Sequence, residues 1–234
     1  MNGVEEDVLG ELTTTFRSGR TRSVAWRKAQ LQAILKLLDE NEEEIFEALK
    51  QDLGKHPVES YRDEVGVVRK SATNALRCVE KWMAPQKAPI PLVLFPARGA
   101  VVSEPLGVVL IFVSWNFPIS LSLDPVIGAI SAGNTIVLKP SELAPKCSSV
   151  LANTIPRYLD PEAIKVIEGG HDVSEQLLQL KWDKIFFTGS PRVGRLIMSA
   201  AAKHLTPVTL ELGGKCPTIL DTLSNSYDLQ VPNG

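Results

Sequence analysis

Four short motifs place polar or glycine residues directly after hydrophobic runs that suit buried strands. They are Ser114–Pro118 (SWNFP), Lys139–Glu142 (KPSE), Phe187–Gly194 (FTGSPRVG) and Leu210–Lys215 (LELGGK). In a parallel sheet, ligands bind in the crevice outside the carboxyl ends of the strands. We therefore expect the chemistry of this chain in the turns that follow its strands.

The first motif contains Asn116, whose side-chain amide can donate a hydrogen bond to an oxygen that becomes negative during a reaction. The motif has none of the glycines of a GxGxxG fingerprint, so cofactor phosphates are not expected at this turn. A purely structural role, in which Asn116 only shapes the turn, is the alternative.

The second motif carries an acidic residue beside a lysine. In doubly wound nucleotide-binding folds, an acidic residue after the second strand holds the adenosine ribose hydroxyls, and Glu142 stands at that point with Lys139 as a further donor. The alternative is an exposed lysine followed by a helix-capping Ser141–Glu142 pair.

The third motif ends a strand at Gly189 and opens a helix with Ser190 and Pro191. Free backbone N–H groups and the positive end of the helix dipole predict a pyrophosphate site there, and glycine permits close approach. The motif lacks the Lys-Ser/Thr pair of a P-loop, which argues against an ATPase or kinase.

The fourth motif places Glu211 beside two glycines, where it could act as a general base if it is partly buried, or accept an N–H of the glycine turn. Three cysteines without a CxxC pair or neighbouring histidine support neither a disulfide framework nor a metal site. We interpret Cys216 as a buried packing residue, and we assign no function to His56, His171 or His204.

The elements that must position these turns follow from hydrophobic spacing. Near-continuous apolar runs with helical patterns between them predict a buried parallel sheet built from βαβ units, with strands at Val108–Val113, Thr135–Leu138, Ile164–Ile167, Lys184–Thr188 and Val208–Leu212. Helices fill the first eighty residues. One ends at Gly54, and capping boxes are expected at Asn41 with Glu44 and at Asp172 with Glu175.

Prolines frame two short β-like runs around Leu92–Phe95 and Ala100–Ser103, which suits edge strands or an arm. The fold class is therefore α/β: a doubly wound, Rossmann-like parallel sheet with an N-terminal helical region and a β-arm for oligomerisation. The expected regions are helices at 1–84, the arm at 85–106 and the α/β domain at 107–210.

Composition excludes several classes of protein. The 234 residues are 44% hydrophobic and 22% charged, which is typical of folded domains, and the net charge of -2 offers no broad basic field for nucleic acid. No apolar run reaches the ~18 residues of a membrane-spanning helix. The acidic start, with Glu5, Glu6 and Asp7, does not fit a secretory or transit peptide. We expect a cytoplasmic protein.

In this order, the four motifs resemble the aldehyde dehydrogenase superfamily, and QDLGK (Gln51–Lys55) with ELGGKCP resembles its class 3 branch, especially the plant members. The resemblance implies NAD-dependent oxidation of medium-chain or aromatic aldehydes to carboxylates, with NADP as an alternative cofactor. It assigns catalytic roles to Asn116, as an oxyanion donor, and to Glu211, as the general base. It assigns cofactor binding to Trp115, Lys139, Glu142, Gly189, Ser190, Gly194, Leu212 and Gly213.

The resemblance also implies that residues 211–234 are the start of a second, catalytic domain, and the chain departs from the family there. The family's nucleophilic cysteine lies in a GQxC-type motif a few tens of residues beyond ELGGK, and the 234 residues contain no such motif. We therefore expect a chain truncated before the catalytic cysteine and inactive by itself. The alternative is a non-catalytic isoform that binds nucleotide. The expected partners are an aldehyde and a second subunit, either an identical chain or a full-length one.

Overall fold

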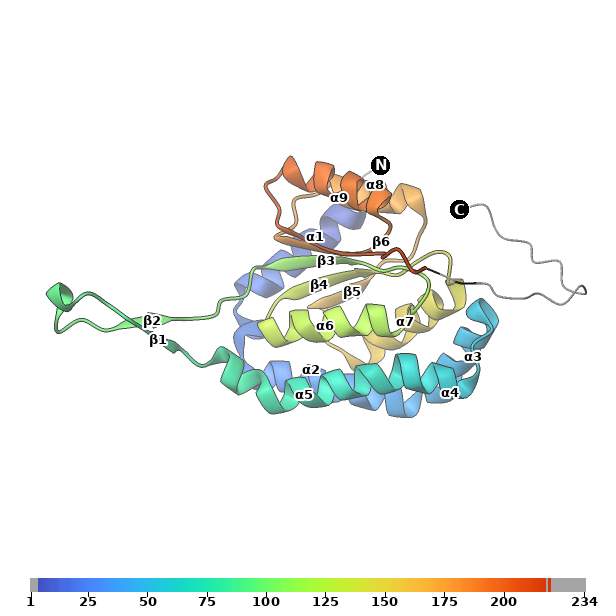
Figure 1. Ribbon diagram of the computed structural model, residues 1–234, viewed down its shortest axis with the longest axis horizontal. Helices are drawn as coiled ribbons and strands as arrows, with labels where there is room; N and C mark the ends of the chain where they lie inside the picture. Colours follow the sequence, from blue (N-terminus) through green and yellow to red (C-terminus); the bar gives the residue numbers. More distant parts are fainter. Residues whose placement is uncertain (1–3, 218, 220–234) are drawn as a thin grey trace, which may run out of the picture.

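Five parallel strands form the sheet at the centre of the molecule (Figure 1). The computed structural model describes residues 4–217 and 219. The strands are β3 (Val108–Phe112), β4 (Thr135–Lys139), β5 (Ile164–Val166), β6 (Lys184–Gly189) and β7 (Val208–Leu212). They lie in the order β5-β4-β3-β6-β7. The expected doubly wound parallel sheet is confirmed, and each strand ends within about one residue of its expected position.

The central strand β3 buries both of its faces, which explains its unbroken run of hydrophobic residues. Val109 and Ile111 belong to the larger hydrophobic core, and Val108, Leu110 and Phe112 belong to the core on the opposite face. Because side chains alternate along a strand, each face needs its own layer of helices. The helices α1, α8 and α9 cover one face, and α6 and α7 cover the other (Figure 1).

Most of the remaining helices form a further layer outside α6 and α7. The helices of the chain are α1 (Val4–Arg17), α2 (Val24–Glu40), α3 (Glu42–Leu53), α4 (Pro57–Ser60), α5 (Gly66–Met83), α6 (Ser120–Ala132), α7 (Pro145–Tyr158), α8 (His171–Gln179) and α9 (Pro191–Ala202). Between α4 and α5 the chain forms a π-helical turn, Tyr61–Val65. In the outer layer α5 packs on α6, and α2 contacts both α6 and α7. Residues from this layer and from the sheet share the larger core.

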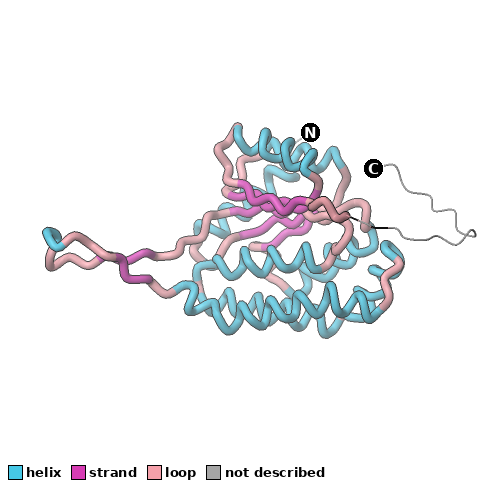
Figure 2. Tube along the Cα trace, in the orientation of Figure 1, coloured by secondary structure: helices cyan, strands magenta, loops and turns pink. Residues whose placement is uncertain are grey.

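The proline-framed segment is an arm that projects from the body of the molecule (Figure 2). Its strands are β1 (Gln86–Ala88) and β2 (Gly99–Val101), which pair antiparallel. The prediction of a strand-like run at Leu92–Phe95 is wrong, because Leu92–Leu94 form a 3-10 turn at the tip. With prolines at 91 and 96 on either side, the tip has no partner for a strand ladder.

Two expected helix caps differ from the structure. The Asn41 side-chain amide donates to the Leu37 carbonyl, 2.8 Å away, and to the Tyr158 hydroxyl, so it faces the preceding helix rather than α3. The helix α8 begins at His171, which places Asp172 inside its first turn instead of at the cap. The expected end at Gly54 is confirmed, with φ of 67° in the left-handed region that favours glycine.

The expected boundary after residue 210 falls within β7, so Glu211 and Leu212 continue the last strand of the sheet. Of the expected second domain at 211–234, Thr218 and residues 220–234 lie outside the described residues. None of the helices among the described residues is both long and apolar enough to cross a membrane.

Candidate functional site

Two adjoining clefts open at the carboxyl ends of the central strands. The first has a volume of about 470 Å³ and lies between the turn after β4 and the helices α8 and α9. The second, of about 920 Å³, lies between the turn after β3 and the end of β7. Both clefts are lined by Ser114, Trp115, Thr188, Gly189 and Ser190. They meet between β3 and β6, where the chain reverses its direction across the sheet and where such folds bind ligands.

The structure brings together all but one of the residues expected in the site. Lys139 and Glu142 line the first cleft, and the second is lined by Asn116, Glu211, Leu212 and Gly213. Gly194 lines neither cleft. It is buried, and a Cβ there would lie 3.2 Å from Leu212 Cδ2, so its smallness serves the packing of α9 on β7.

Lys139 and Glu142 form an ion pair on the wall of the first cleft, with 2.7 Å between Lys139 Nζ and Glu142 Oε2. The lysine side chain is 4% exposed and the glutamate 48%. The alternative of an exposed lysine beside a capping pair is therefore wrong, because Lys139 is buried and α7 begins only at Pro145. Partial burial opposes ionisation of Glu142, but hydrogen bonds from Lys139 and the backbone, with the charges of Lys139 and His171, outweigh it and lower its pKa.

A lowered pKa makes the contribution of Glu142 to stability dependent on pH. The ionised group stabilises the fold above its unfolded pKa of about 4.3, and this contribution disappears as the pH falls through the lower folded pKa. We expect Glu142→Gln to be less stable than the wild type at neutral pH and equal to it in acid, as measured by urea unfolding. In a Lys139→Met background, the same change should show a weaker pH dependence, and an undiminished dependence would contradict the assignment to Lys139.

The amino terminus of α9 faces the boundary of the two clefts. Ser190 caps this helix, with its hydroxyl oxygen accepting a hydrogen bond from Val193 N at 3.3 Å. Pro191 occupies the first turn, where a missing N–H has no cost. The expected helix start is confirmed. It directs N–H groups and the positive end of the helix dipole toward the clefts.

Asn116 is exposed in the turn between β3 and α6. Its side-chain oxygen accepts a hydrogen bond from Ser114 Oγ at 2.7 Å. Its amide nitrogen donates to no other described residue, so both N–H groups remain available to a ligand in the second cleft. The oxygen of Asn116 shapes the turn, as the structural alternative expects, while the nitrogen keeps its donor capacity.

Glu211 lies at the end of β7 and lines the second cleft, and its side chain is exposed among the described residues. No described N–H group donates to its carboxylate, so the alternative of an acceptor in the glycine turn finds no support in this part of the chain. The burial required for a general base is not supplied by residues 4–217.

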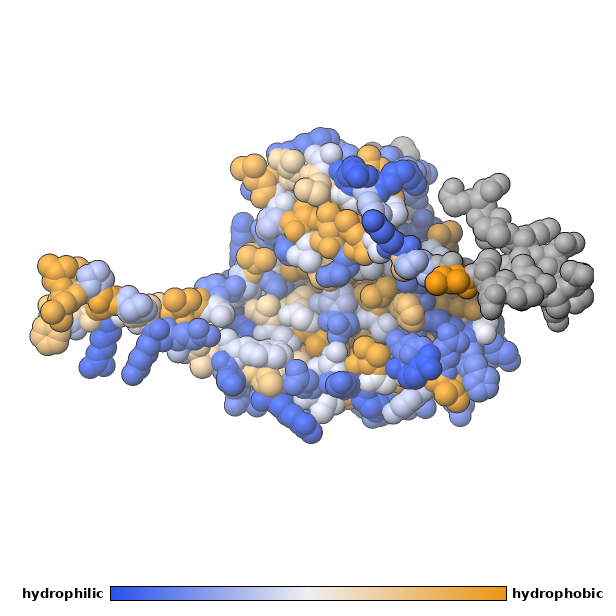
Figure 3. All heavy atoms as spheres, viewed as in Figure 1, coloured by the Kyte–Doolittle hydropathy of each residue, from blue (hydrophilic) through white to orange (hydrophobic). Residues whose placement is uncertain are grey.

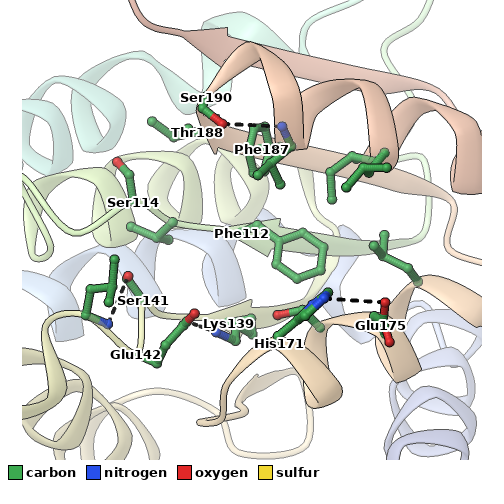
Figure 4. A pocket seen from close by; sticks show the side chains of 18 of the residues that line it. Phe112, Ser114, Lys139, Ser141, Glu142, His171, Glu175, Phe187, Thr188 and Ser190 are labelled. Atoms are coloured by element: carbon green, nitrogen blue, oxygen red, sulfur yellow. Dashed lines mark hydrogen bonds and ion pairs between the residues drawn. The ribbon is translucent and has the colours of Figure 1, made fainter. Parts of the chain in front are cut away.

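Several residues of the first cleft were not expected from sequence. Figure 4 shows His171 and Glu175 approaching from α8, opposite Ser190 and Thr188, with Phe112 and Phe187 forming apolar walls. Their sequence signal is indirect: α8 follows β5, so its first turn opens on the same edge of the sheet as the four motifs. His171, to which the sequence assigned no function, lines the first cleft.

None of the three cysteines lines either cleft. Cys147 is buried in α7, where burial and then the nearby Asp52 carboxylate raise the pKa of its thiol and keep it protonated. Cys216 is exposed, so the prediction of a buried packing residue is wrong. Within residues 4–217 and 219, no group of three or more His, Cys, Asp or Glu side chains is arranged to hold a metal ion.

Comparisons with known proteins agree on one family. The model of the aldehyde dehydrogenase family matches residues 11–230. Aldehyde dehydrogenase family 3 member F1 of Arabidopsis thaliana is 62% identical over 221 residues, which is 94% of this chain and 46% of the relative. The chain thus spans about half the length of the curated relatives it matches.

Solved structures give the same result for the fold. The substrate-bound Staphylococcus aureus AldH is 40% identical, with a TM-score of 0.90 over 95% of this chain and 49% of that one. The Mycobacterium tuberculosis aldehyde dehydrogenase complexed with NAD+ is 28% identical, with a TM-score of 0.80 over 90% of this chain and 44% of its own. The doubly wound sheet and its covering helices are therefore an arrangement that these proteins share.

Proposed function

The chain belongs to the aldehyde dehydrogenase family, in its family 3 branch, and from this premise we propose that it provides the NAD cleft and part of the reaction site of an aldehyde-oxidising enzyme. The observation that carries the proposal is the convergence of a paired lysine and glutamate, a capped helix start and a free side-chain amide on two adjoining clefts.

The first cleft fits the adenosine half of NAD. Its walls are largely apolar, which suits a flat base, and Glu142 beside Lys139 offers an acceptor and a donor for ribose hydroxyls. The start of α9 at Ser190 would hold the pyrophosphate between the clefts. Trp115, Leu212 and Gly213 would then lie along the nicotinamide half in the second cleft.

The second cleft would hold the aldehyde. NAD, when bound, would accept a hydride from the aldehyde carbon after a nucleophile has added to that carbon. Asn116 Nδ2 would donate to the carbonyl oxygen as it gains negative charge, and Glu211 would accept a proton from water. Phe117, Leu121 and Phe186 contribute hydrophobic side chains to the lining, which favours medium-chain or aromatic aldehydes over small polar ones.

Ionised Glu142 favours NAD over NADP as the cofactor. Its pKa is lowered, so the carboxylate stays negative at neutral pH and would repel a 2′-phosphate on the ribose that it contacts. The ammonium group of Lys139 offsets part of this repulsion. We therefore propose NAD as the preferred cofactor and NADP as a weaker one.

Two substitutions at Ser190 test the NAD site while keeping the helix cap. Asparagine and aspartate cap helices about as well as serine, so Ser190→Asn and Ser190→Asp should unfold at similar urea concentrations. Only aspartate places a negative charge where the pyrophosphate would bind. We expect Ser190→Asp to weaken NAD binding by about tenfold or more relative to Ser190→Asn, as measured by calorimetry.

Equal NAD affinity in the two Ser190 variants would contradict a pyrophosphate site at α9. The NAD cleft as a whole would be contradicted if neither the folded wild-type chain nor Ser190→Asn released or absorbed heat of binding at millimolar NAD. Unfolding curves for each variant separate loss of binding from loss of structure.

The arm is the proposed contact with a second subunit. Figure 3 shows hydrophobic residues gathered at its tip, where Leu92, Val93 and Phe95 are 88%, 87% and 81% exposed. Exposed apolar clusters of this kind mark association surfaces. We expect Leu92→Asp/Val93→Asp to reduce the sedimentation coefficient of an associated wild type, whereas Lys87→Asp, on the arm strand β1, should not. An unchanged distribution would exclude the tip from the interface.

A further inference from the structure

A buried ion pair lies directly beneath the turn that carries Asn116. Lys55 Nζ and Glu64 Oε1 are 2.6 Å apart, and the two side chains are 8% and 0% exposed. Neither residue lines either cleft. The pair joins the loop after α3 to the π-helical turn Tyr61–Val65, both in the outer helical layer.

Each partner also holds the main chain of the turn. Lys55 Nζ donates to the carbonyl oxygen of Asn116 at 2.9 Å, and its ammonium group lies 4.1 Å from the centre of the Phe117 ring. Glu64 Oε2 accepts from the backbone N–H groups of Ile119 and Ser120, at 3.1 and 2.8 Å. The turn is thus held at both ends, before and after Pro118.

The local backbone places Glu64 beneath these N–H groups. Its turn is π-helical, a geometry that inserts an extra residue and recurs at functional sites. Gly66 makes the tight turn feasible, because a Cβ at that position would lie 2.7 Å from the Tyr61 carbonyl oxygen. A glycine and a rare backbone geometry together therefore place the Glu64 carboxylate.

Stability alone does not account for a buried lysine and glutamate. Removing two charges from water costs free energy, and well-packed apolar residues of similar volume often stabilise a fold at least as well. What apolar residues cannot do is donate to the Asn116 carbonyl and accept from two N–H groups. The pair therefore supplies a fixed main-chain position.

We propose that Lys55 and Glu64 are positioning residues that hold Asn116 so that its side-chain amide faces the second cleft. The role of Asn116 as an oxyanion donor rests on the proposed function. The positioning of Asn116 by Lys55 and Glu64 does not depend on that function. With its carbonyl held by Lys55 and its side-chain oxygen held by Ser114, Asn116 is fixed at two points beside the second cleft, which it lines.

The test is the mobility of the Asn116 side-chain amide, measured by 15N relaxation on the wild-type chain. Its resonances are identified by their loss in Asn116→Asp. We expect a wild-type order parameter close to the value of about 0.85 that is typical of rigid backbone. Lys55→Met/Glu64→Gln removes both charges together, and glutamine still offers an oxygen to Ile119 and Ser120, so the fold is kept. In this variant the order parameter should fall below about 0.6.

Lys28→Met is the matched control, since Lys28 forms an ion pair of the same length with Glu80 between α2 and α5, away from the turn. It should leave the Asn116 signal unchanged. The proposal would be overturned if the order parameter of the Asn116 amide were the same in the wild type and the double variant, whether both values are high or both are low. NAD titration of the wild type reports on the proposed function separately, through the amides of Lys139–Glu142 and Ser190–Gly194.

Discussion

Glu64→Leu is expected to lower the free energy of unfolding by about 3–5 kcal/mol, because it removes one partner of a buried ion pair. The Lys55 ammonium group would stay buried without a counter-charge, and the N–H groups of Ile119 and Ser120 would lose their acceptor. An unpaired buried charge costs far more than the pair contributes. Urea unfolding followed by circular dichroism measures the loss.

Glu80→Leu is the matched control, since Glu80 also pairs with a lysine at 2.6 Å but is 66% exposed. It should cost less than about 1 kcal/mol, because water and mobile side chains weaken an exposed pair. Lys55→Met/Glu64→Gln should recover much of the loss, since it leaves no unpaired buried charge and keeps an acceptor for the two N–H groups. Equal effects of Glu64→Leu and Glu80→Leu would show that burial of the first pair does not matter.

The sheet was predictable because each strand carries its own signal, a continuous hydrophobic run within a few residues. A strand buried on both faces must be hydrophobic at every position, and Val108–Phe112 has this property. The polar residues of the clefts were predictable for a related reason. Parallel strands end at the same edge, so the turns after β3, β4, β6 and β7 meet whatever the details of packing.

The error at Asn41 arose because its side chain took partners outside the helix that follows it. Asn41 has the sequence of a helix cap, but its amide bonds to Leu37 and to Tyr158, far along the chain. The start of α7 is capped from α3, where Asp52 accepts from the N–H groups of Lys146 and Cys147. A spacing rule within one helix cannot reveal an acceptor that another helix supplies.

Lys55 and Glu64 were missed for the same reason. In the sequence, Lys55 is only the last residue of QDLGK, and Glu64 is one acidic residue among several on helices. Their roles depend on Asn116 and Ser120, more than fifty residues away, and on a π-helical turn for which no spacing pattern exists. Buried charges with long-range partners are identified by a structure and not by periodicity.

Gly189→Ala should weaken NAD binding by about tenfold or more while leaving the fold intact. A Cβ at this position would lie 2.5 Å from Phe187 Cζ, a separation that real contacts do not reach. Phe187 is buried and lines the first cleft, so its ring must turn or shift. Because an aromatic wall of the cleft moves, the space for the adenosine half of NAD would change even though alanine is only one methyl group larger.

Gly10→Ala is the matched control, since a Cβ at Gly10 in α1 meets no atom within 4 Å and the residue lines neither cleft. This change should stabilise the chain by about 0.5–1 kcal/mol, because alanine favours a helix interior, and should leave NAD affinity unchanged. Calorimetry on both variants, with urea unfolding alongside, separates the two effects. Unchanged affinity in a folded Gly189→Ala would mean that Phe187 is not a wall of the NAD site, and the cofactor would then have to lie nearer to the end of β7.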